Sequence, residues 1–375
     1  MNFNKYRLQL LLLLITFLST ALIWFGFYKN IPENLGFPAT TLETVIANYD
    51  GPNYMIVAKC WYQKDCIAQS YSLPQPLEYY PAHLPGFPLL IKYFSFFTNT
   101  PKAMLLATLF GSLLFTLTSF YFYKLFFKEK TAFWLAFLTI FFPARLFVMR
   151  LVGAPETWFL SFILLSIIFF KKKNFLFSAI FAALSQLLKS PGIILFVAYF
   201  IIAFIDYLKT KKLNTNYLFY LLIPLTVLGI FYFYYLQTGD FFAYFHSGDN
   251  FHLTPFPYQV FVSTRTWINT IWLEDVIYVF ALCFFAVAKL WKKYKLDIVF
   301  IFPLLFTLAN VMVAHRDVSR YMIPVYPFVF LAFGKKFASS KIRLIFFLLI
   351  PAVVLYALNF IIGNTAPITT WEPYL

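Results

Sequence analysis

Asp50 is the first residue of this chain whose type and surroundings suit chemistry. It is an acid among aromatic residues, in the stretch from Tyr49 to Tyr54. A carboxylate placed in this way can act as a general base if it reaches an acceptor hydroxyl. Considered alone, Asp50 is better explained as a solvated loop acid or as the N-cap of a helix than as a catalytic group. Glu78 and His83 follow in a segment rich in tyrosine and proline. Glu78 is either a second functional acid or the partner of a cation, and His83 either binds phosphate or metal or has a structural role.

Cations able to hold a phosphate group lie much further along the chain. Lys189, Arg316 and Arg320 each open or precede an expected helix. Arginine binds phosphate through paired hydrogen bonds and lysine acts as a point charge, so these residues are candidates to stabilise a departing phosphate. Glu156 is either another functional acid or the partner of a nearby arginine, and the cost of a charge near the membrane core favours function. A simpler interpretation of Arg316 and Arg320 is an ion-pair cluster with Asp317.

The elements that carry these residues are predicted to be membrane helices. Hydrophobic residues make up 61% of the sequence and charged residues 12%, whereas soluble domains have about 45–50% and about 25%. Apolar stretches between Lys and Arg clusters predict an all-α polytopic fold, with residues 1–375 forming a single domain of about eleven transmembrane helices. These helices are expected at 8–28, 103–127, 131–147, 155–170, 174–189, 191–208, 217–237, 273–291, 297–314, 321–334 and 344–361.

The distribution of charge predicts the orientation of the chain. Most of the 30 Lys and Arg residues fall in alternate short connections, such as the run at 171–173, and these connections are expected to be cytoplasmic. The N-terminus is then inside, and all four histidines and most of the acids are outside. The net charge of +15 is therefore explained by topology rather than by nucleic-acid binding. No G-x-x-x-x-G-K-[ST] motif is present, so an ATP-driven pump is not expected.

Two outer segments are long, 29–102 and 237–272, and long loops are usually functional or disordered. Within the first, 41–62 is predicted to be an amphipathic interfacial helix and 85–98 a second helix at the bilayer surface. Cys60 and Cys66 lie in the same outer loop. They form a disulfide in an oxidising compartment or stay as two free thiols, and the sequence does not choose between these alternatives.

A metal site is not predicted. His246, Asp249 and His252 have a spacing that suits zinc, but no third imidazole or further carboxylate is fixed nearby. The sequence contains no Asp-x-Asp motif, so no cofactor is required and a divalent cation is allowed but not demanded.

The motifs around Asp50 resemble those of the GT-C glycosyltransferases, in particular the family of the second mannosyltransferase of glycosylphosphatidylinositol synthesis and its bacterial relatives. Asp50, Tyr54, Ala58 and Tyr62 keep the spacing of that family's first outer loop, with Tyr49 in place of its Trp. Weaker matches are spread from about 48 to 334, and they comprise Tyr79-Tyr80-Pro81, Phe87-Pro88-Leu89-Leu90, Pro143 with Glu156, Lys189-Ser190-Pro191-Gly192, Ser319-Arg320-Tyr321, and Pro324 to Pro327.

The resemblance implies a membrane glycosyltransferase that moves a hexose, mannose, from a polyprenyl-phosphate donor to an acceptor hydroxyl at the non-cytoplasmic face. It implies inversion at the anomeric carbon, Asp50 as the base, and Tyr54, Glu78, His83, Glu156, Lys189, Arg316 and Arg320 as substrate-binding candidates. The acceptor is a lipid, a glycan or a protein, and the expected location is a bacterial inner or plasma membrane. The alternatives are a transporter or flippase of lipid-linked saccharides, and a polysaccharide polymerase or ligase with its catalytic residues in 237–272. Charges at helix ends and the lack of a visible repeat count against transport.

Overall fold

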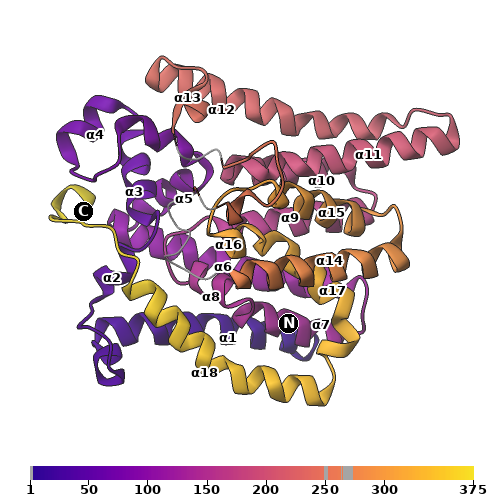
Figure 1. Ribbon diagram of the computed structural model, residues 1–375, viewed down its shortest axis with the longest axis horizontal. Coiled ribbons are helices and arrows are strands. Elements are labelled where there is room, and N and C mark those ends of the chain that lie inside the picture. The colour runs from indigo at the N-terminus through magenta and orange to yellow at the C-terminus, as the bar shows by residue number, and fades with distance from the viewer. Residues whose placement is uncertain (1–2, 249–251, 263, 265–272) are drawn as a thin grey trace.

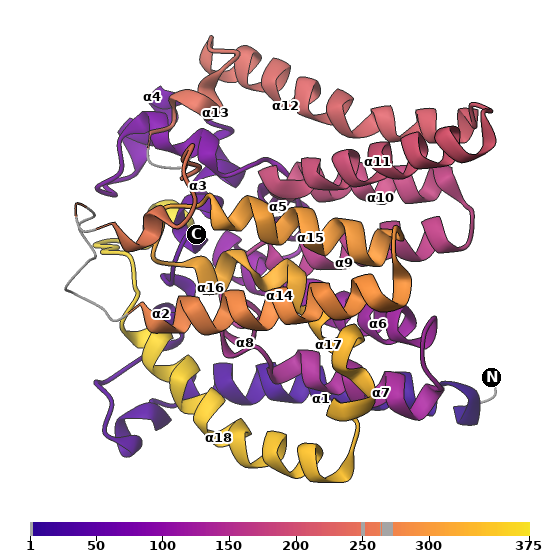
Figure 2. The same ribbon diagram turned by 45° about the vertical axis from the view of Figure 1, so that its right-hand side comes forward.

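The computed structural model describes residues 3–248, 252–262, 264 and 273–375. This part of the chain is helical, without strands, and its helices run roughly parallel in a bundle (Figures 1 and 2). Helices occupy all eleven intervals expected from the sequence. They are α1 (Phe3–Tyr28), α6 (Thr100–Lys124), α7 (Glu129–Phe141), α9 (Glu156–Lys171), α10 (Phe175–Leu188), α11 (Ile193–Thr210), α12 (Leu222–Thr238), α14 (Glu274–Tyr294), α15 (Ile298–Val311), α17 (Tyr326–Phe337) and α18 (Ser340–Ile362).

Five helical segments in the described residues are long and apolar enough to cross a membrane. They are Tyr6–Tyr28, Thr100–Lys124, Ser190–Thr210, Thr215–Thr238 and Ser340–Ile362. The protein is thus a helical membrane protein, and a count of eleven crossings stays a prediction. The most hydrophobic part of α6 is 67% buried, whereas the corresponding parts of the other four are 22–28% buried. α6 is therefore the most enclosed of the five, and it packs against α1, α7, α9 and the short helix α5 (Gly86–Ser95).

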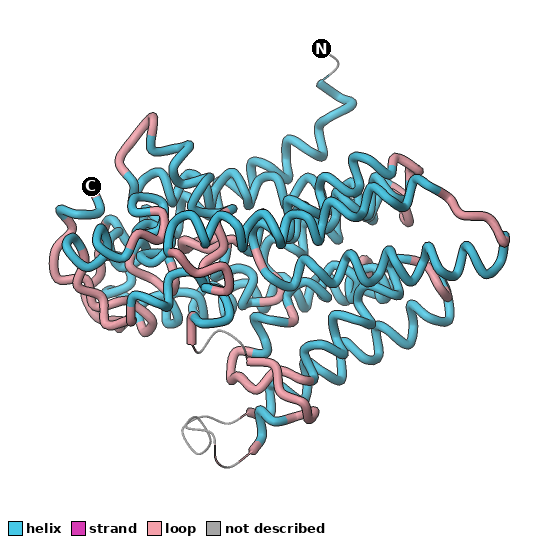
Figure 3. Tube along the Cα trace, turned by 90° about the horizontal axis from the view of Figure 1, so that it is seen from above, coloured by secondary structure: helices cyan, strands magenta, loops and turns pink. Residues whose placement is uncertain are grey.

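Shorter elements gather at one end of the bundle, on the left in Figures 1 and 2. They are α2 (Leu42–Ile46), α3 (Gly51–Cys60), α4 (Lys64–Ser70), α5 (Gly86–Ser95), α8 (Ala144–Met149), α13 (Ala243–His246) and α16 (Val318–Tyr321). The described residues also form seven short 3-10 segments: Ile31–Leu35, Leu77–Ala82, Ser190–Gly192, Thr215–Leu221, Gln259–Phe261, Ile323–Val325 and Glu372–Tyr374. The C-terminal segment lies on the same side in Figures 2 and 3, and the start of α1 lies on the right in Figure 2.

The prediction of one interfacial helix over 41–62 is wrong. The chain forms two helices there, because the backbone of Tyr49 is left-handed, with φ of 60°, and the turn at Asn48 to Asp50 separates α2 from α3. Nor does α3 lie on the surface, since nine of its residues are buried and it packs against α5 and α6. α5 falls within the expected 85–98.

Cys60 and Cys66 form a disulfide that joins the end of α3 to α4. The alternative of two free thiols is thereby removed.

Candidate active site

Asp50 directly precedes α3, but its carboxylate makes no capping hydrogen bond to that helix. The Oδ2 atom instead accepts hydrogen bonds from Nη1 and Nη2 of Arg320 at 3.3 and 3.2 Å. The Oδ1 atom lies 3.8 Å from Nε2 of His83. The side chain of Asp50 is still 26% exposed, so a small group can reach it. The structure thus places this acid beside a cation of a distant segment and not in a helix cap.

Arg320 connects Asp50 to a second acid. Its Nε donates to Oε1 of Glu156 at 2.6 Å, and Nζ of Lys189 donates to the same oxygen at 2.8 Å. Glu156 opens α9, Lys189 follows the last residue of α10, and Arg320 lies in α16. We call Asp50, Glu156, Lys189 and Arg320 the charge cluster. It contains two acids and two cations, so its formal charge is zero.

Each member of the charge cluster keeps some capacity for a ligand. A guanidinium has five N–H donors and an ammonium three, and the bonds to the two acids leave donors free on both Arg320 and Lys189. The Oε2 atom of Glu156 is buried and makes no hydrogen bond. A buried polar atom without a partner is costly, so the site is better satisfied when a ligand or water is present.

The electrostatic surroundings keep Asp50 ionised. Burial by itself would raise the pKa of Asp50, but the His83 imidazole and the Arg320 charge outweigh burial and lower the pKa below its ordinary value. Asp50 is therefore a carboxylate throughout the physiological pH range. For Lys189, burial lowers the pKa, and the Glu156 carboxylate opposes this only in part.

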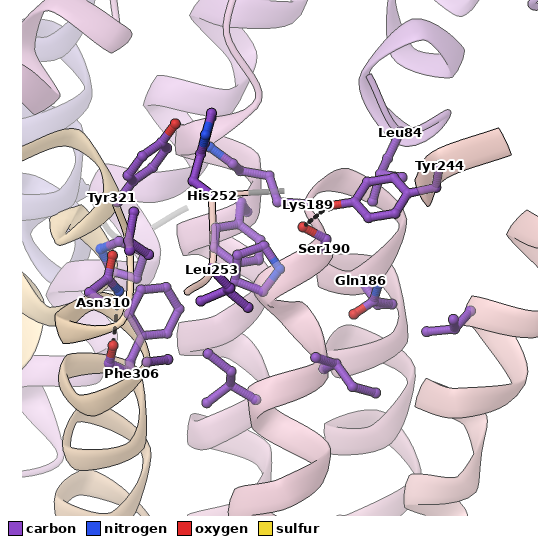
Figure 4. Close-up of a pocket in the computed structure, with 18 of the residues that line it drawn as sticks. Leu84, Gln186, Lys189, Ser190, Tyr244, His252, Leu253, Phe306, Asn310 and Tyr321 are labelled. Carbon is purple, nitrogen blue, oxygen red and sulfur yellow. Dashed lines mark hydrogen bonds between the residues drawn. The ribbon is translucent and has the colours of Figure 1, made fainter. Parts of the chain in front are cut away.

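A cavity of about 650 Å³ adjoins the charge cluster. Glu156, Lys189 and Arg320 line it, whereas Asp50 does not. The rest of the wall is mainly apolar and comes from α9, α10, α11, α12, α15 and the segment after α16. Figure 4 shows Lys189, His252 and Tyr321 above Leu253 and Phe306, whereas Gln186 and Asn310 lie lower, among the apolar residues. The acid, the lysine and the arginine of the lining all belong to the charge cluster. An apolar chain with an anionic end would match this distribution.

The remaining candidates from the sequence are placed as follows. His83 and Tyr54 are buried beside Asp50, and the Tyr54 ring meets the His83 ring edge-on at 4.8 Å. Tyr62 donates to the backbone oxygen of His83 at 2.6 Å and so holds this segment. Glu78 is exposed and pairs with Lys64 at 2.8 Å, so the structure does not bring it to the site.

Arg316 is also outside the charge cluster, with an exposed side chain. The alternative interpretation of Arg316 and Arg320, an ion-pair cluster with Asp317, does not describe the structure, because Asp317 accepts a hydrogen bond from Arg145 at 2.6 Å. Asp317 further accepts a hydrogen bond from the Tyr49 hydroxyl. Sequence reasoning missed this second cluster, because Tyr49, Arg145 and Asp317 come from three distant segments and share no motif.

Among the described residues, no group of three or more His, Cys, Asp or Glu side chains is arranged to hold a metal ion. His246 pairs with Asp240 at 2.6 Å, and His252 stacks on His315 with ring centres 4.3 Å apart. Asp249, the third residue of the zinc spacing, lies outside the described residues.

Comparisons with known proteins give a structural answer only. No model of a protein family matches the chain, and no curated protein matches it. Among solved structures, the chain is similar to the crystal structure of the Archaeoglobus fulgidus oligosaccharyltransferase tethered to an acceptor peptide, with a TM-score of 0.56 and 14% identity over 98% of this chain. It is also similar to the oligosaccharyltransferase AglB of Archaeoglobus fulgidus in complex with an inhibitory peptide and a dolichol-phosphate, with a TM-score of 0.52 and 13% identity over 99% of this chain.

In both cases this chain covers 57% of the other chain's length. At such low identity the likeness establishes the fold and not the activity. The helical bundle that carries the charge cluster therefore shares the fold of these two oligosaccharyltransferase structures.

Proposed function

We propose that this protein is a membrane glycosyltransferase that moves a single hexose, mannose, from a polyprenyl-phosphate donor to an acceptor hydroxyl at the non-cytoplasmic face. The observation that carries the proposal is the position of Arg320, which binds Asp50 and also lines a largely apolar cavity. A base and a phosphate-binding cation are thus adjacent at the end of a space suited to a lipid chain. The fold of the two oligosaccharyltransferase structures supports the same class of reaction.

In the proposed reaction the polyprenyl chain occupies the cavity and its phosphate contacts Lys189 and Arg320. The acceptor hydroxyl gives its proton to Asp50 as its oxygen forms a bond to the anomeric carbon. The bond from that carbon to the phosphate oxygen breaks, and the lipid phosphate leaves with the electron pair. The two cations stabilise the charge that develops on the departing phosphate. Because attack comes opposite the phosphate, the anomeric configuration is inverted.

Donor binding also improves the base. A carboxylate held by Arg320 is a weak base, since the cation lowers its pKa. A phosphate that competes for the Arg320 N–H donors weakens the hold on Asp50 and lets its pKa rise toward the ordinary value. The base is then strengthened when the donor is in place.

The Cys60–Cys66 disulfide supports a non-cytoplasmic position for the first outer loop, since disulfides persist mainly in oxidising compartments. The compartment that we propose is the outer side of a bacterial inner or plasma membrane.

The test is transfer from polyprenyl-phosphate mannose, compared with the glucose and galactose donors, in membranes that contain the native protein or Asp50→Asn. The acceptors offered would be a lipid, a glycan and a peptide. We expect Asp50→Asn to lose about 10²- to 10⁴-fold in rate. Asp65→Asn is the matched control, because Asp65 is an exposed acid of the same outer loop. Native-level transfer by Asp50→Asn would remove Asp50 as the base, and transfer only from a preassembled lipid-linked oligosaccharide would favour the polymerase or ligase alternative.

A further inference from the structure

Asp317 and Arg320 are three residues apart around the short helix α16, a spacing at which an acid and an arginine commonly pair. In this structure the Asp317 carboxylate is turned elsewhere. One oxygen accepts from Nη2 of Arg145 at 2.6 Å, and the other accepts from the Tyr49 hydroxyl. Although Asp317 is also the N-cap residue of α16, it makes no capping hydrogen bond there. Two outside groups thus determine where this buried carboxylate points.

Tyr49 contacts both arginines. The Arg320 guanidinium lies 4.1 Å from the centre of the Tyr49 ring, and the Arg145 guanidinium lies 5.5 Å from it. The Arg145 guanidinium also lies 3.8 Å from the centre of the Phe360 ring. The ring of Tyr49 therefore packs between the charge cluster and the Arg145–Asp317 pair, and its hydroxyl is bonded to Asp317.

Backbone groups near the C-terminus of the chain hold Tyr49 in position. Its left-handed backbone, with φ of 60°, is uncommon for a residue with a bulky side chain. The Tyr49 N–H donates to the backbone oxygen of Asn364 at 3.0 Å, and the side chain of Asn48 donates to those of Ile361 and Asn364 at 2.7 and 2.9 Å. These bonds compensate for the backbone conformation, so the ring is held in one place.

We propose that Tyr49 is a positioning residue that keeps Asp317 paired with Arg145 and so prevents it from neutralising Arg320. This inference rests on the proposed function, in which Arg320 contacts the donor phosphate. Arg320 already faces two carboxylates, Asp50 and Glu156. A third carboxylate would occupy its remaining N–H donors and would repel the phosphate. Tyr49 thus acts through Asp317 and does not touch the donor.

The test compares Tyr49→Phe, Asp317→Asn and the double variant for binding of a radiolabelled polyprenyl phosphate that carries no sugar. Tyr49→Phe keeps the ring on Arg320 but releases Asp317, so we expect binding about tenfold weaker than native. Asp317→Asn removes the competing charge, so the double variant should return to native binding within about twofold. Tyr71→Phe is the control, because the Tyr71 hydroxyl donates to the backbone of Pro373 in the same outer region and touches neither cluster.

A merely structural role for the hydroxyl would leave the double variant as weak as Tyr49→Phe, and that result would overturn the proposal. A structure of Tyr49→Phe gives a readout that needs no substrate. We expect Asp317 to turn toward Arg320, and Asp317 still paired with Arg145 would count equally against the proposal. If the native protein neither transferred a sugar nor bound polyprenyl phosphate, the proposed function would fail, and the position of Asp317 in this variant would still decide the present inference.

Discussion

Arg320 donates a hydrogen bond to Glu156 at 2.6 Å across a separation of 164 residues. The bond joins the start of α9 to α16, and both side chains are buried, at 7% and 4% exposed. Each partner also faces a second opposite charge, since Lys189 donates to Glu156 and Arg320 donates to Asp50. The pair therefore holds the site together as well as offering donors to a ligand.

Replacement of Arg320 by lysine tests this geometry with the charge retained. A lysine ammonium cannot match the guanidinium fork that spans Asp50 and Glu156. We expect Arg320→Lys to lower the transfer rate by about 10- to 100-fold, equivalent to about 1.4–2.8 kcal/mol, and to lower the unfolding temperature in detergent. Arg316→Lys is the control and should behave as the native protein, since Arg316 is exposed and outside the charge cluster. Equal losses in both variants would contradict the assignment.

The pKa of Lys189 predicts how the rate depends on pH. Burial lowers this pKa, so the ammonium is lost at a lower pH than for a free lysine as the pH rises. If Lys189 holds the donor phosphate as a cation, kcat/KM falls on the alkaline side at that lowered pKa. In Lys189→Arg the cation persists, and we expect the alkaline limb to move to higher pH. Lys92→Arg, at a lysine that lies over Trp61, should leave the limb in place; an unchanged profile in Lys189→Arg would exclude Lys189 as the titrating group.

The cavity next to the charge cluster predicts the effect of blocking the lipid chain. Val227 lines the cavity from α12, whereas Leu225, two residues earlier, does not and is 57% exposed. We expect Val227→Trp to raise the KM for the polyprenyl-phosphate donor by about tenfold, through loss of apolar contact area, with little change in kcat. Leu225→Trp is the matched control. A donor KM that is unchanged in Val227→Trp would mean that the chain lies elsewhere.

The Cys60–Cys66 disulfide predicts both stability and sidedness. It closes a short loop, with six residues of sequence separation, and its loss should cost about 2 kcal/mol by the chain-entropy account. We expect Cys60→Ser with Cys66→Ser to lower the unfolding temperature. In intact cells, mild reduction should let a membrane-impermeant thiol reagent label the partly exposed Cys66 but not the buried Cys283. Labelling only in inverted membranes would reverse the predicted orientation.

Arg150 provides a stability test that is separate from the reaction. It is fully buried, and its guanidinium donates to the backbone oxygens of Ile140, at the end of α7, and Thr16 in α1. A cation at this place satisfies a carbonyl that the helix end leaves free. Arg150→Met leaves these groups without that donor, so we expect a loss of about 2–4 kcal/mol in unfolding free energy.

The control for Arg150 is Arg343→Met. Arg343 donates to the backbone oxygen of Ala338 at the end of α17, but it is exposed. Water replaces its hydrogen bond, and the change should stay within about 0.5 kcal/mol. Comparable losses in the two variants would show that burial is not what makes Arg150 important.

The sequence located helices well where a single physical signal dominated. Long apolar stretches between lysine clusters have one stable arrangement in a bilayer, because backbone groups must be satisfied within the helix, and a helix lies at each of the eleven intervals. The stretch 41–62 has no such signal. Its division at Tyr49 depends on backbone bonds to Ala366 and Asn364 at the other end of the chain, which no local pattern reveals.

For the site, the residue types and their spacing around Asp50 were visible in the sequence, and so were the cations that could face it. The sequence did not show which cation lies beside which acid. Arg316 and Arg320 lie four residues apart in one segment, yet one is exposed and the other is buried against Asp50 and Glu156. That choice is made by the direction in which α16 packs against α8 and α14. The sequence alone therefore determined a helical membrane protein and the acids and cations that are candidates for its chemistry. Only the tertiary structure decided the pairing of charges, because a salt bridge requires side chains to meet within a few ångströms, and packing alone sets such distances.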